Sequence, residues 1–142
     1  MRAEEILEAS VYASDLDAAE RFYTSVLGLE VMQRVEGRHV FFRCGARVLL
    51  VFNPERTREG AVVPGHGSEG PGHVCFAMRE QEIDAWRERL RAAGVPIETE
   101  HRWPSGGFSL YFRDPAGNSL ELGTPRIWTI DEEDVFGVGK GG

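Results

Sequence analysis

The sequence predicts an α+β fold in which a βαβββ unit occurs twice, and two observations carry this prediction. Each half of the chain has a strand-like segment, an amphipathic helical segment that ends at a glycine, and three more strand-like segments. Glu8 and His73 precede the helix-ending Gly28 and Gly94 by nearly equal lengths of chain, as counterparts in an internal repeat would. We expect two curved four-stranded sheets, each covered by its own helix, that together form one larger open barrel.

The first repeat is expected over residues 5–54. Residues 6–13 mix apolar and small residues as a strand does, and Ser14 or Asp15 then caps a helix with apolar residues at helical spacing. Gly28 ends this helix, because glycine is favoured just after the last helical residue. Three strands follow in the segments LEVMQRV, HVFFRC and ARVLLVF.

The second repeat is expected over residues 72–124, after a Gly- and Pro-rich loop at 55–71. GHVCFAM is predicted to be a strand and EQEIDAWRERLRAAG an amphipathic helix. VPIETEHRW, GFSLYFRD and NSLELG supply three further strands. Residues 1–124 are therefore expected to form a single domain. Residues 125–142 form a C-terminal tail, whose Ile127, Trp128 and Ile130 are candidates for docking on a partner subunit.

The composition excludes several functional classes. A net charge of −7 argues against nucleic acid or an anionic membrane as a partner, since both require a basic surface. No apolar run approaches the roughly 20 residues that span a bilayer, and the N-terminus lacks a signal-peptide core, so a cytoplasmic location is expected. Cys44 and Cys75 lack metal-site spacing and are expected to be buried free thiols. His39 and His101 are expected at the surface or at strand edges.

Strand alternation selects three candidate functional side chains. Leu120 and Leu122 share one face of a strand, so Glu121 points the opposite way. The more apolar face of each repeat should pack on its helix, which leaves Glu8, His73 and Glu121 on the inner surface. Two carboxylates about 4 Å apart repel by on the order of 4 kcal/mol at an effective dielectric near 20. A divalent cation, a shared proton or a bound cationic ligand would relieve that repulsion.

Three segments, in order and at the repeat spacing, resemble the vicinal oxygen chelate (glyoxalase/bleomycin resistance protein/extradiol dioxygenase) superfamily. VYASDLDAAERFYTSVLGLEV resembles its first strand and aspartate-capped helix, GHVCFAM its fifth strand, and YFRDPAGNSLEL its closing hairpin. The resemblance covers about residues 6–124. It implies an open barrel of the glyoxalase/bleomycin-resistance type in a homodimer that binds small molecules.

The resemblance also implies that Glu8, His73 and Glu121 are metal ligands. His73 and Glu121 match the usual residue types, whereas Glu8 stands where the family more often has histidine or glutamine. Two oxygen donors and one imidazole suit Fe(II), Mn(II), Zn(II), Ni(II) or Mg(II) without choosing among them. Where glyoxalase I members have a fourth ligand, this chain offers Leu50 or Val51, so a standard glyoxalase I site is not expected.

The implied activity is that of a metal-dependent enzyme whose ion binds adjacent oxygens of a small substrate and acts as a Lewis acid. Glu121 and Glu8 are the catalytic candidates, because either can also serve as a general base. Lyase, isomerase and dioxygenase chemistry all remain open.

The alternative is a metal-free protein that binds a cationic antibiotic in an acidic cup and confers resistance. His66, in the long loop, is a candidate lid residue. Four aromatic residues are candidates for lining the pocket: Tyr12, Trp103, Phe108 and Tyr111.

Overall fold

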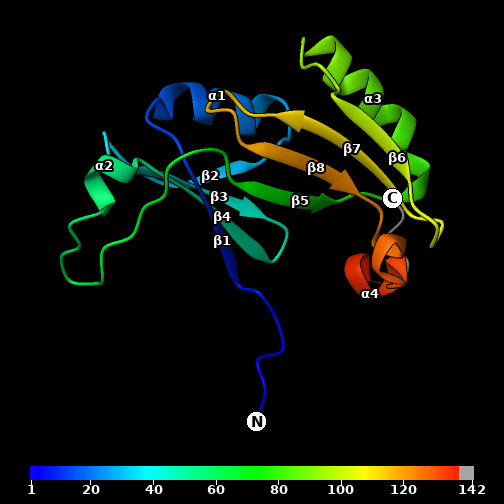
Figure 1. The fold of residues 1–142 in the computed structure, drawn as a ribbon, viewed down its shortest axis with the longest axis horizontal. Helices are drawn as coiled ribbons and strands as arrows, with labels where there is room; N and C mark the ends of the chain where they lie inside the picture. The colour runs from blue at the N-terminus through cyan, green and yellow to red at the C-terminus, as the bar shows by residue number, and fades with distance from the viewer. Residues whose placement is uncertain (138–142) are drawn as a thin grey trace. The chain divides into compact units, whose positions relative to one another are not determined.

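The computed structural model describes residues 1–137 and confirms an α+β fold made of two βαβββ modules (Figure 1). The first module contains β1 (Glu8–Tyr12), α1 (Leu16–Ser25), β2 (Glu30–Val35), β3 (His39–Cys44) and β4 (Arg47–Phe52). The second contains β5 (His73–Ala77), α3 (Ile83–Ala92), β6 (Thr99–Arg102), β7 (Phe108–Arg113) and β8 (Ser119–Gly123). The strand orders, β1-β4-β3-β2 and β5-β8-β7-β6, are the same in the two separate sheets, so the predicted repeat is present in the topology.

Four short helices complete the described chain: α2 (Pro54–Thr57), η1 (Glu80–Glu82), η2 (Pro125–Trp128) and α4 (Glu132–Phe136). The chain divides into two compact units. One contains residues 1–73 together with the turn at 114–118, and the other contains residues 74–113 and the chain from Ser119 onward. That residues 1–124 act as a single domain stays a prediction.

The first module forms because one face of its sheet is apolar and packs on α1. Asp15 caps this helix by accepting a hydrogen bond from the backbone N–H of Ala18 at 2.9 Å, which satisfies one of the unpaired donors at the helix start. Gly28, at φ 69°, follows the helix end as predicted. The helix contacts β2, β3 and β4. Its buried residues and those of the sheet make up this core: Leu16, Ala19, Phe22, Tyr23, Val11, Val40, Phe42, Leu49 and Val51.

Two predicted strands are shorter in the structure than in the sequence-based expectation. β1 begins at Glu8, where its pairing with Val48 of β4 begins, and the preceding Ile6 and Leu7 are exposed. β6 begins at Thr99, where its pairing with Tyr111 of β7 begins. β6 is an edge strand, and all four of its residues, including His101, are exposed as predicted.

The turn of the DPAGN motif is fixed by two buried polar side chains. The Asp114 carboxylate accepts hydrogen bonds from the Tyr23 hydroxyl at 2.7 Å and from the Asn118 amide nitrogen at 2.9 Å. Asn118 in turn accepts from the backbone N–H of Gly72 at 2.7 Å and donates to the backbone oxygen of Tyr12 at 3.1 Å. Burial, together with the Asp114 charge, raises the pKa of Tyr23. The Asp and Asn of this motif therefore stabilise the fold, and Glu121 follows the turn on β8.

The first part of the predicted tail is ordered against the second module. A Cβ atom on Gly107 would lie 2.2 Å from the backbone nitrogen of Ile127, and the Ser105 hydroxyl lies 3.4 Å from the Ile127 carbonyl oxygen. Ile127 therefore packs on its own module and is half-buried there, and its docking on a partner subunit stays a prediction. Trp128 and Ile130 are exposed. Residues 138–142 of the tail lie outside the described residues.

Both cysteines are free thiols, as predicted, but they are not fully buried: Cys44 is half-buried and Cys75 is exposed. Among residues 1–137, no helix combines the length and the apolar character that crossing a bilayer requires.

Candidate functional site

Glu121 occupies the middle of β8 and points away from the apolar side of its sheet. Leu120 and Leu122, on either side of it, are almost completely buried. Glu121 is itself only 6% exposed, so its carboxylate is sheltered from water. In the antiparallel pair β7–β8, Tyr111 lies opposite Glu121 and Ser109 lies opposite Gly123. Side-chain alternation therefore puts Ser109 and Tyr111 on the face that carries Glu121.

Two side chains form a hydrogen-bonded chain to the Glu121 carboxylate. The hydroxyl of Ser109 donates to Glu121 Oε1 at 2.5 Å, and the indole Nε1 of Trp103 donates to Ser109 Oγ at 2.9 Å. Trp103 is among the residues predicted from the sequence to line the pocket, whereas Ser109 is not. The available signal was the alternation of GFSLYFRD, which puts Ser109 and Tyr111 on one face.

Cys75 and Tyr111 also lie against Glu121. Burial, the charge of Glu121 and a hydrogen bond with it raise the pKa of the Cys75 thiol to about 12, so the thiol is protonated at neutral pH. Burial and the same carboxylate raise the pKa of Tyr111. Cys75 is exposed as a residue, but its Sγ faces the glutamate. His73 lies two residues before Cys75 on β5, is exposed, and shares its strand face by alternation.

Phe108 lies on the other face of β7 from Ser109 and Tyr111, and it is buried. The guanidinium groups of Arg87 and Arg102 lie over its ring, with their Cζ atoms 5.2 and 4.7 Å from the ring centroid. That Phe108 lines a substrate pocket stays a prediction. The ring packs beneath α3 because strand alternation turns it to that side.

Glu8 lies on β1 of the first module and is exposed. It shares a strand face with Ser10 and Tyr12, while Val11, on the other face, is buried. The Tyr12 hydroxyl is 2.8 Å from His66 Nδ1, and the His66 ring stands edge-on to Phe52 with 4.5 Å between ring centroids. His66, the candidate lid residue, is therefore in contact with Tyr12, one of the aromatic residues predicted to line the pocket.

His39 is buried on β3, contrary to the expectation of a surface position. Its ring stacks on Phe41 with 4.0 Å between centroids. Nδ1 lies 2.7 Å from Nη1 of Arg38, and because a guanidinium only donates, Nδ1 accepts and Nε2 carries the hydrogen. Nε2 has no hydrogen-bond partner among the described residues. Burial and the Arg38 charge lower the pKa of His39, so the imidazole is neutral at pH 7.

The three predicted metal ligands provide two carboxylates and one imidazole, a donor set that suits a divalent cation. Within residues 1–137, no group of three His, Cys, Asp or Glu side chains is close enough to hold a metal ion.

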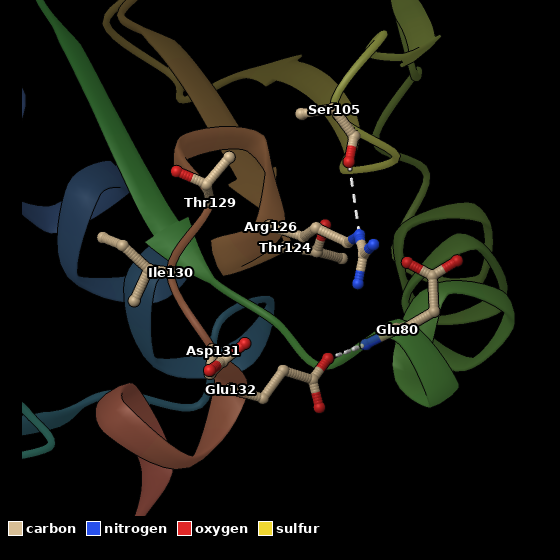
Figure 2. Close-up of a pocket in the computed structure, with 8 residues that line it drawn as sticks. All are labelled: Glu80, Ser105, Thr124, Arg126, Thr129, Ile130, Asp131 and Glu132. Carbon is tan, nitrogen blue, oxygen red and sulfur yellow. Dashed lines mark hydrogen bonds between the residues drawn. The ribbon is translucent and has the colours of Figure 1, made fainter.

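A cavity of about 380 Å³ lies where η2 and the start of α4 meet the second module (Figure 2). Arg126 projects into it, and its Nε donates to the carbonyl oxygen of Ser105 at 3.2 Å. The backbone N–H of Glu80 donates to the Glu132 carboxylate at 2.6 Å, which ties α4 to η1. The lining is largely acidic and hydroxylic: Glu80, Ser105, Thr124, Arg126, Thr129, Ile130, Asp131 and Glu132.

Comparison with known proteins identifies one family. A family model described as Glyoxalase/Bleomycin resistance protein/Dioxygenase superfamily matches residues 5–122. A crystal structure of a lactoylglutathione lyase from Agrobacterium tumefaciens has a TM-score of 0.88 and 43% sequence identity, and the match covers 92% of this chain and 100% of that one.

Several curated relatives are transferases. The glutathione transferase FosA of Serratia marcescens is 33% identical over 110 residues, which is 77% of this chain and 72% of that protein. The metallothiol transferase FosB of Bacillus licheniformis is 27% identical over 116 residues, which is 81% of this chain and 71% of that protein.

Proposed function

We propose that this chain, which belongs to the Glyoxalase/Bleomycin resistance protein/Dioxygenase superfamily, is a metal-dependent enzyme acting on a small oxygenated substrate. The observation that carries the proposal is Glu121, a carboxylate 6% exposed on the face of β8 opposite its leucines. Burying a charge is costly unless it is compensated, so a buried carboxylate on a sheet face is a strong candidate for a functional group.

The proposed ligands are Glu8, His73 and Glu121. A divalent ion bound there would supply Lewis-acid stabilisation of an oxyanion on the substrate. Glu121 or Glu8 would accept the substrate proton as a general base, and the shelter of Glu121 from water favours that role. Leu50, which pairs with Ser10 across β1 and β4, offers no donor atom, so we propose three protein ligands rather than four. Lyase, isomerase and dioxygenase chemistry are the candidate reactions.

We also propose that the protein acts as a cytoplasmic homodimer in which two copies of the chain complete each metal site. The support is membership of this superfamily, since dimerisation is typical of the fold. In such a dimer, Glu8 of one copy would join His73 and Glu121 of the other.

Metal content is the first test. We expect the purified protein to hold a stoichiometric divalent metal, and a chelator to lower its melting temperature. Mn(II) at about 100 times its dissociation constant should add roughly 2.7 kcal/mol of stability. Glu121→Gln and His73→Ala should abolish this gain, while Glu30→Gln, an exposed glutamate on β2, serves as the matched control. A protein without metal, indifferent to chelator and to Mn(II), Fe(II), Ni(II) and Zn(II), would contradict the proposal.

Subunit mixing tests the shared site. Glu8→Gln and Glu121→Gln proteins should each bind no metal alone. If two chains build each site, unfolding and refolding them together should yield heterodimers that have one intact site. No recovery of Mn(II) binding in the mixture, with dimers present by light scattering, would assign all three ligands to one chain.

The second candidate is a metal-free protein that binds a planar cation. In its favour, Tyr12 and Phe52 are cross-strand partners and their rings lie 6.3 Å apart between centroids. Glu8 shares the Tyr12 face of β1. Aromatic faces and a carboxylate together suit a cationic ligand. Binding of bleomycin by calorimetry in the presence of chelator, lost in Tyr12→Ala, would favour this candidate over the enzyme.

A further inference from the structure

We propose that Ser109 and Trp103 are positioning residues that set the orientation of the Glu121 carboxylate. This inference rests on the proposed role of Glu121 in metal binding. Neither residue is a proposed metal ligand, and neither is assigned a positioning role by the family match or the relatives. The evidence is a chain of two hydrogen bonds with one possible direction, of which the bond from Ser109 to Glu121 is buried and the bond from Trp103 to Ser109 is part-buried.

The direction follows from the hydrogen atoms that each group carries. An indole N–H only donates, so Ser109 Oγ accepts from Trp103 Nε1 at 2.9 Å. A serine hydroxyl has a single hydrogen, and Ser109 places it on Glu121 Oε1 at 2.5 Å. Ser109 is completely buried, so water does not compete for this bond. The bonds therefore run from Trp103 through Ser109 to the carboxylate, and each polarises the next.

The register of the sheet shows why Glu121 can reach Ser109. Tyr111 is directly opposite Glu121, whereas Ser109 is its diagonal neighbour and lies opposite Gly123. A Cβ atom on Gly123 would lie 3.4 Å from Glu121 Oε1 and 2.9 Å from Cys75 Sγ. Because glycine leaves this space open, the glutamate side chain can lean across position 123 to the serine.

Trp103 is held in place by the turn that it begins. Its backbone N–H donates to the Gly107 carbonyl at 2.8 Å, and its carbonyl accepts from the Gly106 N–H at 2.9 Å. The ring of His101 packs edge-on to the indole with 4.5 Å between centroids. Ile127 of η2 packs on Gly107, so the tail supports the same turn. The indole N–H is thus held in a fixed position. A fixed donor of this kind can orient a metal ligand without itself binding the metal.

The test compares Mn(II) affinity by calorimetry in the full-length protein. Ser109→Ala should weaken binding about tenfold or more, as is typical when a residue that orients a metal ligand is lost. Trp103→Phe should weaken it less, and the double variant should match Ser109→Ala, because Trp103 acts through Ser109. Ser109→Thr, which keeps the hydroxyl, should retain affinity. Ser25→Ala is the matched control, since that exposed hydroxyl donates to the Arg21 carbonyl within α1 and should leave affinity unchanged.

A second readout needs no metal. In a crystal structure of metal-free Ser109→Ala, Glu121 should adopt a different side-chain rotamer from the wild type. An unchanged rotamer, or Mn(II) affinity within twofold of wild type while Glu121→Gln abolishes binding, would overturn the positioning role. If wild type and Glu121→Gln both fail to bind Mn(II), the proposed metal site has failed, and the rotamer comparison alone decides the positioning role.

Discussion

The hydrogen bond between Tyr23 and Asp114 should make Tyr23→Phe one of the more damaging conservative substitutions in the chain. Tyr23 is completely buried on α1, and its hydroxyl donates to Asp114 Oδ2 at 2.7 Å. Hydrogen bonds to charged groups contribute about 1.5–3 kcal/mol. Asn118 continues to donate to the same oxygen, so the carboxylate does not lose all its partners and a loss of about 2 kcal/mol is expected.

Urea unfolding followed by circular dichroism measures this loss. The midpoint should fall with an unchanged m-value, and the melting temperature should drop by about 4–8 °C, given about 2–4 °C per kcal/mol for a chain near this size. Tyr12→Phe is the matched control, because its hydroxyl bonds to His66 in a half-buried setting and is worth about 1 kcal/mol at most. A loss below about 0.5 kcal/mol for Tyr23→Phe would refute the assignment of this bond as a main tie of the turn.

The same pair predicts how stability depends on pH. The folded pKa of Tyr23 is raised above the unfolded value near 10, so its contribution is fully present below pH 10. Above pH 10 the unfolded chain loses the proton while the folded chain keeps it. Stability should then fall by up to about 1.4 kcal/mol per pH unit, and Tyr23→Phe should remove this part of the slope. A slope above pH 10 that is identical in the two proteins would contradict this assignment.

Three further predictions concern single sites. His39→Phe should change stability by less than about 1 kcal/mol in urea unfolding, because it removes the buried Nε2 donor, which has no partner among the described residues, but also the bond that Nδ1 accepts from the half-buried Arg38. A loss above about 2 kcal/mol would contradict this balance. Glu121→Gln should lower the pKa of the Cys75 thiol, because it removes the adjacent negative charge. Iodoacetamide should then alkylate Cys75 faster at pH 8, and an unchanged rate would refute the contact between Cys75 and Glu121. Gly107→Ala should destabilise by more than about 2 kcal/mol, because the added Cβ meets the backbone of Ile127, which cannot rotate away; a near-neutral result would show that the tail does not pack there.

Local patterns in the sequence predicted the repeated βαβββ units, because helix caps, helix-ending glycines and strand alternation depend on neighbouring residues alone. Such patterns predicted that Asp15 caps α1. They also predicted that Glu121 points to the opposite side of β8 from the leucines on either side of it. The family resemblance came from the same segments, since the aspartate-capped helix and the DPAGN turn are local features.

The partners of those residues were decided by the tertiary structure. Ser109 meets Glu121 only because β7 and β8 pair in a register that places Gly123, and not a larger residue, opposite the serine. Asp114 and Asn118 depend on Tyr23, Gly72 and Tyr12, which are distant in sequence.

The burial of His39 and the covering of Phe108 by two arginines likewise depend on which elements pack over each strand. Alternation in a sequence fixes the relative faces of residues within one strand. The register between strands and the element that covers each face are set by packing across the whole module, which no single segment encodes.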